Sequence, residues 1–170
     1  MRRISIIGCS GGGKSTLARK LGDRLGLPVV HIDQLFWLPG WVERDRDSVR
    51  ALVTEAVAQD AWVFEGNNTR SFDIRLPRTD TLIWIDQPRW LCLWRAIRRA
   101  AVGFGRSRPD MAPGCPERFD LDFWKFIWNF NRLSVPRMEA AIAAFGPHLS
   151  IVRLRSDREI AAFLASVDGR

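Results

Sequence analysis

The stretch that decides the fold is Gly8-Cys9-Ser10-Gly11-Gly12-Gly13-Lys14-Ser15. It matches GxxxxGK[ST] at every fixed position, the pattern of a loop whose backbone N–H groups wrap a phosphate. The apolar run 4–7 before it predicts a buried strand. Residues 15–25 after it predict a helix whose positive end points at the same anion. The sequence therefore predicts a phosphate site at a strand–loop–helix junction.

We expect this loop to bind a nucleoside triphosphate, ATP in the simplest case, together with Mg²⁺. Lys14 is expected to reach the β- and γ-phosphates and to act in catalysis, and the Ser15 hydroxyl is expected to hold the metal. A glycine-rich turn with no ligand is the alternative, but it does not explain the flanking strand and helix. The expected nucleotide-binding set is Gly8, Ser10, Gly11, Gly12, Gly13, Lys14, Ser15, Thr16 and Arg95.

Strand and helix patterns alternate along the rest of the chain. Such alternation predicts an α/β fold of the P-loop NTPase type, nucleoside/nucleotide kinase-like, with a five-stranded parallel sheet and helices on both faces. We expect one domain over residues 1–170, with a lid and helical insertion at about 95–135. The predicted strands are 4–7, 28–32, 61–64, 81–85 and 150–154, and the predicted helices are 15–25, 45–59, one following Pro88, 121–145 with a break near Pro136, and one opened by the capping box 156–159.

Acidic residues close the predicted strands, at the sheet edge where α/β proteins bind ligands. Asp33 ends the second strand, where a carboxylate can accept the proton of an attacking hydroxyl; capping a loop is the alternative. Glu65 follows the third strand and suits water-mediated Mg²⁺ coordination. Gly66 and Arg70 come next, Gly66 for close approach of a substrate and Arg70 to grip its phosphate or carboxylate, or to lie on a surface turn. Asp33, Glu65, Gly66 and Arg70 form the expected acceptor site, with Ser15 and Glu65 as the metal residues.

Arginines gather on the helix after Pro88 and on the glycine-rich loop 103–117. On that helix the apolar Leu91, Trp94 and Ile97 are expected on one side, and Arg95, Arg98 and Arg99 on the other. Phosphoryl transfer needs positive charge and exclusion of water, and a lid that carries arginines supplies both. We assign Arg99 a catalytic role, against the alternative of a solvated basic face.

Composition narrows the possible partners. The chain has 170 residues and a net charge of +7, and lysine provides only Lys14, Lys20 and Lys125 of its 26 cations. No apolar run approaches the ~20 residues of a membrane helix, so we expect a cytoplasmic protein without a membrane partner. The basic charge is compatible with DNA, but no DNA-binding motif is present, so a small-molecule acceptor is favoured. Three widely spaced cysteines predict neither a disulfide framework nor a zinc site.

Several segments together resemble the bacterial "DNA topology modulation protein" (FlaR-like) family, which is similar to adenylate kinases. The resemblance spans nearly the whole chain, and its last two segments are specific to that family. It implies a P-loop kinase fold with ATP as donor, but it implies no particular acceptor. The segments are 13–21, 32–41, 88–95, 108–117 and 126–131.

These patterns predict an ATP-dependent phosphotransferase that acts on a nucleoside, a nucleotide or a related metabolite. A nucleotide-dependent regulatory ATPase or switch, acting on DNA topology or on a protein partner, is the alternative. A drug-modifying or drug-sequestering kinase relative is a third possibility. Sequence does not fix the acceptor, the choice between ATP and GTP, or the oligomeric state.

Overall fold

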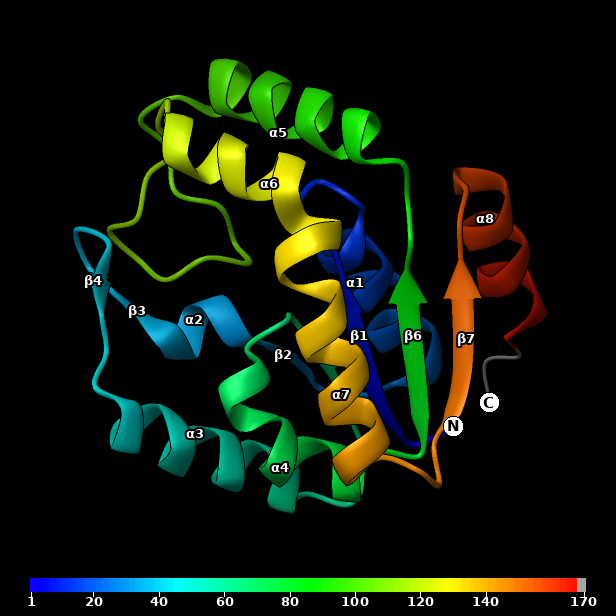
Figure 1. The fold of residues 1–170 in the computed structure, drawn as a ribbon. Coiled ribbons are helices and arrows are strands. Elements are labelled where there is room, and N and C mark those ends of the chain that lie inside the picture. The colour runs from blue at the N-terminus through cyan, green and yellow to red at the C-terminus, as the bar shows by residue number, and fades with distance from the viewer. Residues whose placement is uncertain (168–170) are drawn as a thin grey trace.

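A computed structural model describes residues 1–167. Five parallel strands form its central sheet, as the alternating pattern predicted (Figure 1). In spatial order they are β2 (Val29–His31), β5 (Trp62–Glu65), β1 (Arg3–Gly8), β6 (Thr81–Ile85) and β7 (Ser150–Leu154). The phosphate loop leaves the middle strand, and its neighbours β5 and β6 both pair with β1 in parallel.

Helices cover both faces of the sheet. One face packs on α1 (Lys14–Leu25) and α8 (Asp157–Ser166), through side chains such as Leu17, Leu21 and Phe163. The other face packs on α3 (Arg46–Ala58), α4 (Phe72–Arg75), α5 (Arg89–Gly103), α6 (Leu121–Leu133) and α7 (Val135–Phe145). Short 3₁₀ turns at Thr69–Ser71 and Leu76–Arg78 flank α4. Since the central strands β1, β5 and β6 are buried on both sides, their apolar runs need no alternation, whereas the edge strand β7 is largely exposed.

Local signals in the sequence set several helix ends. Gly26 closes α1 at φ 65°, a left-handed conformation that glycine adopts without strain. Asp45 caps α3 by accepting from the Ser48 N–H, and Ser156 caps α8 by accepting from the Glu159 N–H. The predicted break in the long helix 121–145 falls at Ser134, between α6 and α7.

One prediction about local structure was wrong. The second strand ends at His31, and Asp33 lies in the first turn of the short helix α2 (Ile32–Phe36) instead of ending that strand. A small antiparallel hairpin then follows, formed by β3 (Trp37–Leu38) and β4 (Val42–Glu43), which periodicity did not indicate because its strands are only two residues long. Its turn holds Gly40 at φ 80° and Trp41 at φ 63°.

The orientation of α5 also differs from the prediction. Its buried stripe consists of the small residues Cys92, Ala96 and Ala100, while Trp94 and Ile97 are exposed. Small side chains let α5 approach the phosphate loop closely. The side of α5 that is buried is therefore set by this close packing and not by the hydrophobicity of its side chains. Within residues 1–167, no helix combines the length and the apolar character needed to cross a membrane.

Candidate functional site

The path of the phosphate loop requires glycine. Gly8, Gly11 and Gly13 have φ of 140°, 84° and 99°. A Cβ on Gly11 would lie 2.2 Å from the carbonyl oxygen of Cys92 in α5, and one on Gly8 would lie 2.2 Å from that of Ile85 in β6. Both positive φ and contact with neighbouring backbone therefore exclude larger residues at these two positions.

The loop ends as an anion cradle at the start of α1. Gly13 is the N-cap residue and makes no side-chain cap hydrogen bond, so the first-turn N–H groups of α1 face the cavity without an internal acceptor from that residue. The Lys14 ammonium donates to the Cys9 carbonyl at 3.2 Å. Ser10, Gly11, Gly12, Gly13, Ser15 and Thr16 line the same cavity. This arrangement fits a phosphate chain.

Glu65 lies buried at the end of β5 and joins three other groups. Its carboxylate accepts from the Ser15 hydroxyl at 3.3 Å and from His31 Nδ1 at 2.9 Å, and it lies 3.8 Å from Lys14 Nζ. Burial opposes the charge, but the His31 hydrogen bond and the Lys14 charge outweigh it and hold the pKa of Glu65 below its ordinary value. Glu65 therefore stays ionised. Its oxygens and the Ser15 hydroxyl are the hard donors that Mg²⁺ prefers, so the residues fit the expected metal.

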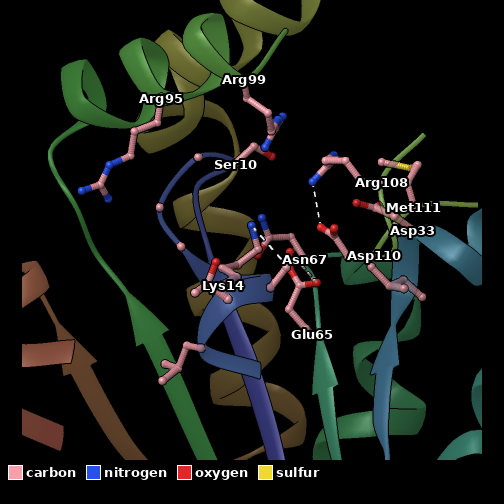
Figure 2. Close-up of a pocket in the computed structure, with 18 of the residues that line it drawn as sticks. Ser10, Lys14, Asp33, Glu65, Asn67, Arg95, Arg99, Arg108, Asp110 and Met111 are labelled. Carbon is pink, nitrogen blue, oxygen red and sulfur yellow. Dashed lines mark hydrogen bonds and ion pairs between the residues drawn. The ribbon is translucent and has the colours of Figure 1, made fainter. Parts of the chain in front are cut away.

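Asn67 holds the phosphate loop at its first residue. Its side-chain oxygen accepts from the Gly8 N–H at 2.9 Å, and its side-chain nitrogen donates to the Gly8 carbonyl at 2.7 Å. The two bonds tie the β5 edge to the start of the loop, next to Lys14 and Glu65 (Figure 2). No sequence pattern predicted a role for Asn67. A short amide side chain two residues beyond a strand end was the only signal.

Asp33 faces the cavity from α2 and is partly buried. Loss of hydration raises its pKa to about 6, and the nearby Glu65 carboxylate adds to the shift against the opposing charges of Lys14 and Arg108. Because the residues around it include the phosphate-loop lysine, Asp33 lies at the phosphate end of the cavity. Asp33 thus lies near the phosphate loop on helix α2, and its role toward an acceptor stays a prediction.

Arginines reach the cavity from α5 on one helix stripe. Arg95 and Arg99 both line it, four residues apart, whereas Arg98 is exposed and stacks over Trp94 at 5.7 Å. Arg95 pairs with Asp157 at the start of α8, and in Figure 2 its side chain points away from Lys14. Arg99 Nε lies 3.0 Å from Glu117 Oε1. Of the three arginines expected on one side of this helix, only Arg95 and Arg99 line the cavity.

Loop 104–117 forms most of the connection between α5 and α6 and lies against the α2 region. Two backbone hydrogen bonds join the two ends of the loop. The Gly105 N–H donates to the Glu117 carbonyl, and the Glu117 N–H donates to the Arg106 carbonyl, both at 3.0 Å. At its far end the Gln34 side chain donates to the Pro109 carbonyl at 2.6 Å, and the Gly40 N–H donates to the Gly114 carbonyl at 2.8 Å. The loop is therefore fixed at both ends in this conformation.

The same loop brings a charged pair into the cavity. Arg108 lies 2.7 Å from Asp110 and 2.5 Å from Glu117, both largely buried. Burial opposes ionisation of Asp110, but the Arg108 charge and the Ser15 hydroxyl keep its pKa low. Figure 2 shows Arg108, Asp110 and Met111 beside Asp33. Arg108 belongs to the arginines expected on the glycine-rich loop 103–117. Asp110 and Glu117 were not predicted, because no spacing rule indicates which carboxylate meets which arginine across a loop.

One cavity of about 1440 Å³ joins these parts. It runs past the phosphate loop to a far end walled by Phe36, Trp37 and Trp41, and Arg70 reaches its edge from an exposed position. Gly66 lines it too, at φ 122°, but the space for its Cβ is taken by Ile32 Cγ2 at 2.0 Å. Gly66 is thus required by packing, in addition to any approach of a substrate.

Comparison with solved structures identifies the fold. The shikimate kinase from Acinetobacter baumannii in complex with shikimate superposes with a TM-score of 0.61 at 15% identity, covering 95% of this chain and 88% of that chain. A gluconokinase from Sinorhizobium meliloti 1021 gives a TM-score of 0.54 at 16% identity, covering 96% and 91%. A shikimate kinase from Bacteroides thetaiotaomicron gives 0.53 at 17% identity, covering 96% and 94%. No family model and no curated protein matches the sequence.

The chain thus has an α/β P-loop NTPase fold, with the same architecture as small-molecule kinases. The similarity extends over nearly the whole length of each neighbour, so no large part of that fold is missing. None of the three solved structures compared above is a topology modulation protein. The resemblance to that family therefore stays a prediction.

Proposed function

We infer that this chain is a phosphotransferase that moves the γ-phosphate of Mg·ATP to a hydroxyl of a small acceptor. The observation that carries the inference is the position of Asp33. A partly buried carboxylate with a pKa near 6 lines the same cavity as Lys14 and Ser15, and arginines of α5 and loop 104–117 line that cavity too. A regulatory switch that hydrolyses nucleotide without an acceptor needs no such carboxylate or aromatic acceptor end.

The residues divide the work by position. Backbone N–H groups of the loop and Lys14 bind the phosphates, and Ser15 with Glu65 would hold Mg²⁺, which neutralises phosphate charge when bound. Asp33 orients the acceptor hydroxyl and takes its proton as the oxygen attacks phosphorus. At neutral pH a carboxyl of pKa about 6 is ionised, yet more basic than an ordinary aspartate, which favours this task.

The arginines and the loop complete the proposed site. Arg99 and Arg108 share Glu117 and lie on the cavity side, where their charge would stabilise the transferring group. Loop 104–117 with the adjoining helix ends acts as the lid that excludes water, an insertion within one domain over residues 1–170. Gly66 and Arg70 would contact the acceptor, and Arg95 would face the nucleotide side near α8.

The decisive experiment measures ADP release from Mg·ATP in the presence of nucleosides, nucleotides and hydroxylated metabolites such as sugars and cyclic polyols. Lys14→Ala serves as the blank. Acceptor-dependent ADP release that Lys14→Ala abolishes would support the kinase and define its substrate class. ATP binding with slow, acceptor-independent hydrolysis across the whole panel would overturn it in favour of the regulatory ATPase.

A further inference from the structure

The outer side of α5 carries apolar side chains where a surface helix normally carries polar ones. Trp90, Trp94 and Ile97 follow at i, i+4 and i+7, so they share one stripe, and Trp90 is 63% and Trp94 54% exposed. The opposite stripe of the same helix is the one buried against the phosphate loop and α6. Helix α5 therefore has a second apolar stripe that nothing in residues 1–167 covers.

Helix α6 continues this surface. Leu121 and Trp128 lie seven residues apart on it, and they are 66% and 45% exposed. The Arg89 guanidinium of α5 stacks over the Trp128 ring at 4.5 Å, which joins the two outer stripes into one. In Figure 1 the two helices lie side by side at one end of the molecule. We call this surface the outer α5–α6 face; it consists of Arg89, Trp90, Trp94, Ile97, Arg98, Leu121, Lys125, Trp128 and Arg132.

The charge of this face has one sign. Helix α5 contains no acidic residue between Arg89 and Gly103. On α6, Asp122 is paired with Lys125 at 3.0 Å, and Arg132 follows on the outer stripe. Cationic side chains thus alternate with exposed tryptophans, and the face complements an anionic surface.

We propose that the outer α5–α6 face docks on an anionic lipid surface. Bilayer interfaces accept tryptophan rings at headgroup depth, aliphatic side chains just below, and arginines against anionic headgroups. A second copy of the chain would place like charges opposite one another. A nucleic acid would stack on the tryptophans but would offer nothing to Ile97 and Leu121.

Docking here would leave the cavity free. None of the three tryptophans lines it, and Arg95 and Arg99, which do, project from the other side of α5. The sequence-based expectation of no membrane partner considered only membrane-spanning segments. Binding to a membrane surface requires instead an exposed face with apolar and cationic side chains. The proposal does not depend on the kinase assignment.

The test is co-sedimentation of the full chain with vesicles of two compositions. Phosphatidylcholine mixed with phosphatidylglycerol should bind the protein at least tenfold more tightly than phosphatidylcholine alone, and added salt should weaken the binding. Trp90→Ser with Trp94→Ser should weaken it at least tenfold, since both rings are removed from the interface. Arg89→Gln with Arg98→Gln should weaken it by about the same factor.

The matched control changes residues of the same kinds elsewhere. Arg46→Gln at the start of α3 and Ile151→Ser on β7 alter an exposed arginine and an exposed aliphatic side chain far from α5 in sequence, and together they should leave vesicle binding unchanged. Circular dichroism melts of all variants would show that each still folds.

Three results would overturn the proposal. The first is equal binding to both vesicle types, or to neither. The second is binding to a single-stranded oligonucleotide, lost in Trp90→Ser with Trp94→Ser, without vesicle binding. The third is a concentration-dependent dimer in sedimentation velocity that the same variant dissociates, again without vesicle binding. The second and third would reassign the face to a nucleic acid and to a second copy.

Discussion

The two ends of the cavity are built in different ways. At the phosphate end, eight consecutive residues fold on themselves, and Asn67, Lys14 and Glu65 fix them through short contacts. At the acceptor end, the wall is assembled from α2, the β3–β4 hairpin and loop 104–117, which meet through contacts between segments 75 or more residues apart. One contiguous motif thus encodes the backbone path of the phosphate end, although Asn67 and Glu65 reach it from residues 50 or more positions away. The acceptor end has no contiguous motif at all.

The largest expected effect falls at the phosphate end. Lys14→Ala removes the one lysine charge beside the loop, so ATP turnover should fall by about 10³-fold, in the range seen when an electrostatic donor to a reacting group is lost. Acceptor-dependent ADP release measures the effect, and titration with a fluorescent ATP analogue should show weakened binding. Lys125→Ala, an exposed lysine of α6 that does not line the cavity, is the matched control. Normal turnover in Lys14→Ala would remove the phosphate loop from the chemistry.

The second-largest effect is expected at Asp33, which lies between the phosphate end and the acceptor end of the cavity. Asp33→Asn keeps the shape but cannot take a proton, so kcat should fall by about 10²–10⁴-fold while ATP affinity is retained. Asp45→Asn, which preserves the α3 cap, is the control. Equal losses of ATP affinity and of kcat would instead assign Asp33 to nucleotide binding.

The pKa of Asp33 gives a separate signature. Because this pKa is raised to about 6, the carboxyl becomes protonated as the pH falls through 6, and a protonated carboxyl cannot act as the base. The kcat of the wild-type protein should therefore fall as the pH drops below about 6. Between about pH 6 and neutral pH it should stay level. The residual rate of Asp33→Asn should lack that decline. A profile identical in both proteins would assign the ionisation to another group.

The same contrast explains what the sequence could predict. The phosphate loop, α1 and the parallel sheet follow from a contiguous motif and from alternating apolar runs, and the structure confirms them. Asp33 was found because strand ends meet at one edge of a sheet, although its helix was missed. Asp110 and Glu117 could not be assigned, since pairing with Arg108 and Arg99 depends on how loop 104–117 closes. The orientation of α5 was also beyond a hydrophobicity argument, because small residues face the loop.

A smaller effect is expected at Asn67, which tests how rigid the phosphate end must be. Asn67→Asp keeps the acceptor for the Gly8 N–H but replaces the donor to the Gly8 carbonyl by a charged oxygen. ATP affinity should fall by roughly tenfold, the cost of one lost hydrogen bond to a buried partner. Isothermal titration with Mg·ATP measures it, and Asn68→Asp, in the neighbouring cap position, is the control. Unchanged affinity would show that the loop holds its shape without this clamp.

The smallest effect is expected at Arg70, at the acceptor end. Its side chain is exposed and reaches the cavity only at the edge, and its backbone carbonyl accepts from Arg50. Arg70→Gln should therefore raise the KM for an anionic acceptor by about two- to fivefold, with kcat and the KM for ATP unchanged, because an exposed ion pair contributes up to about 1 kcal/mol. Steady-state kinetics with the acceptor identified by the ADP-release panel would measure this. Arg78→Gln, which leaves the cavity lining intact, is the matched control. A fall in kcat without a change in the acceptor KM would instead place Arg70 at the transferring phosphate, so that the two ends of the cavity would share their arginines.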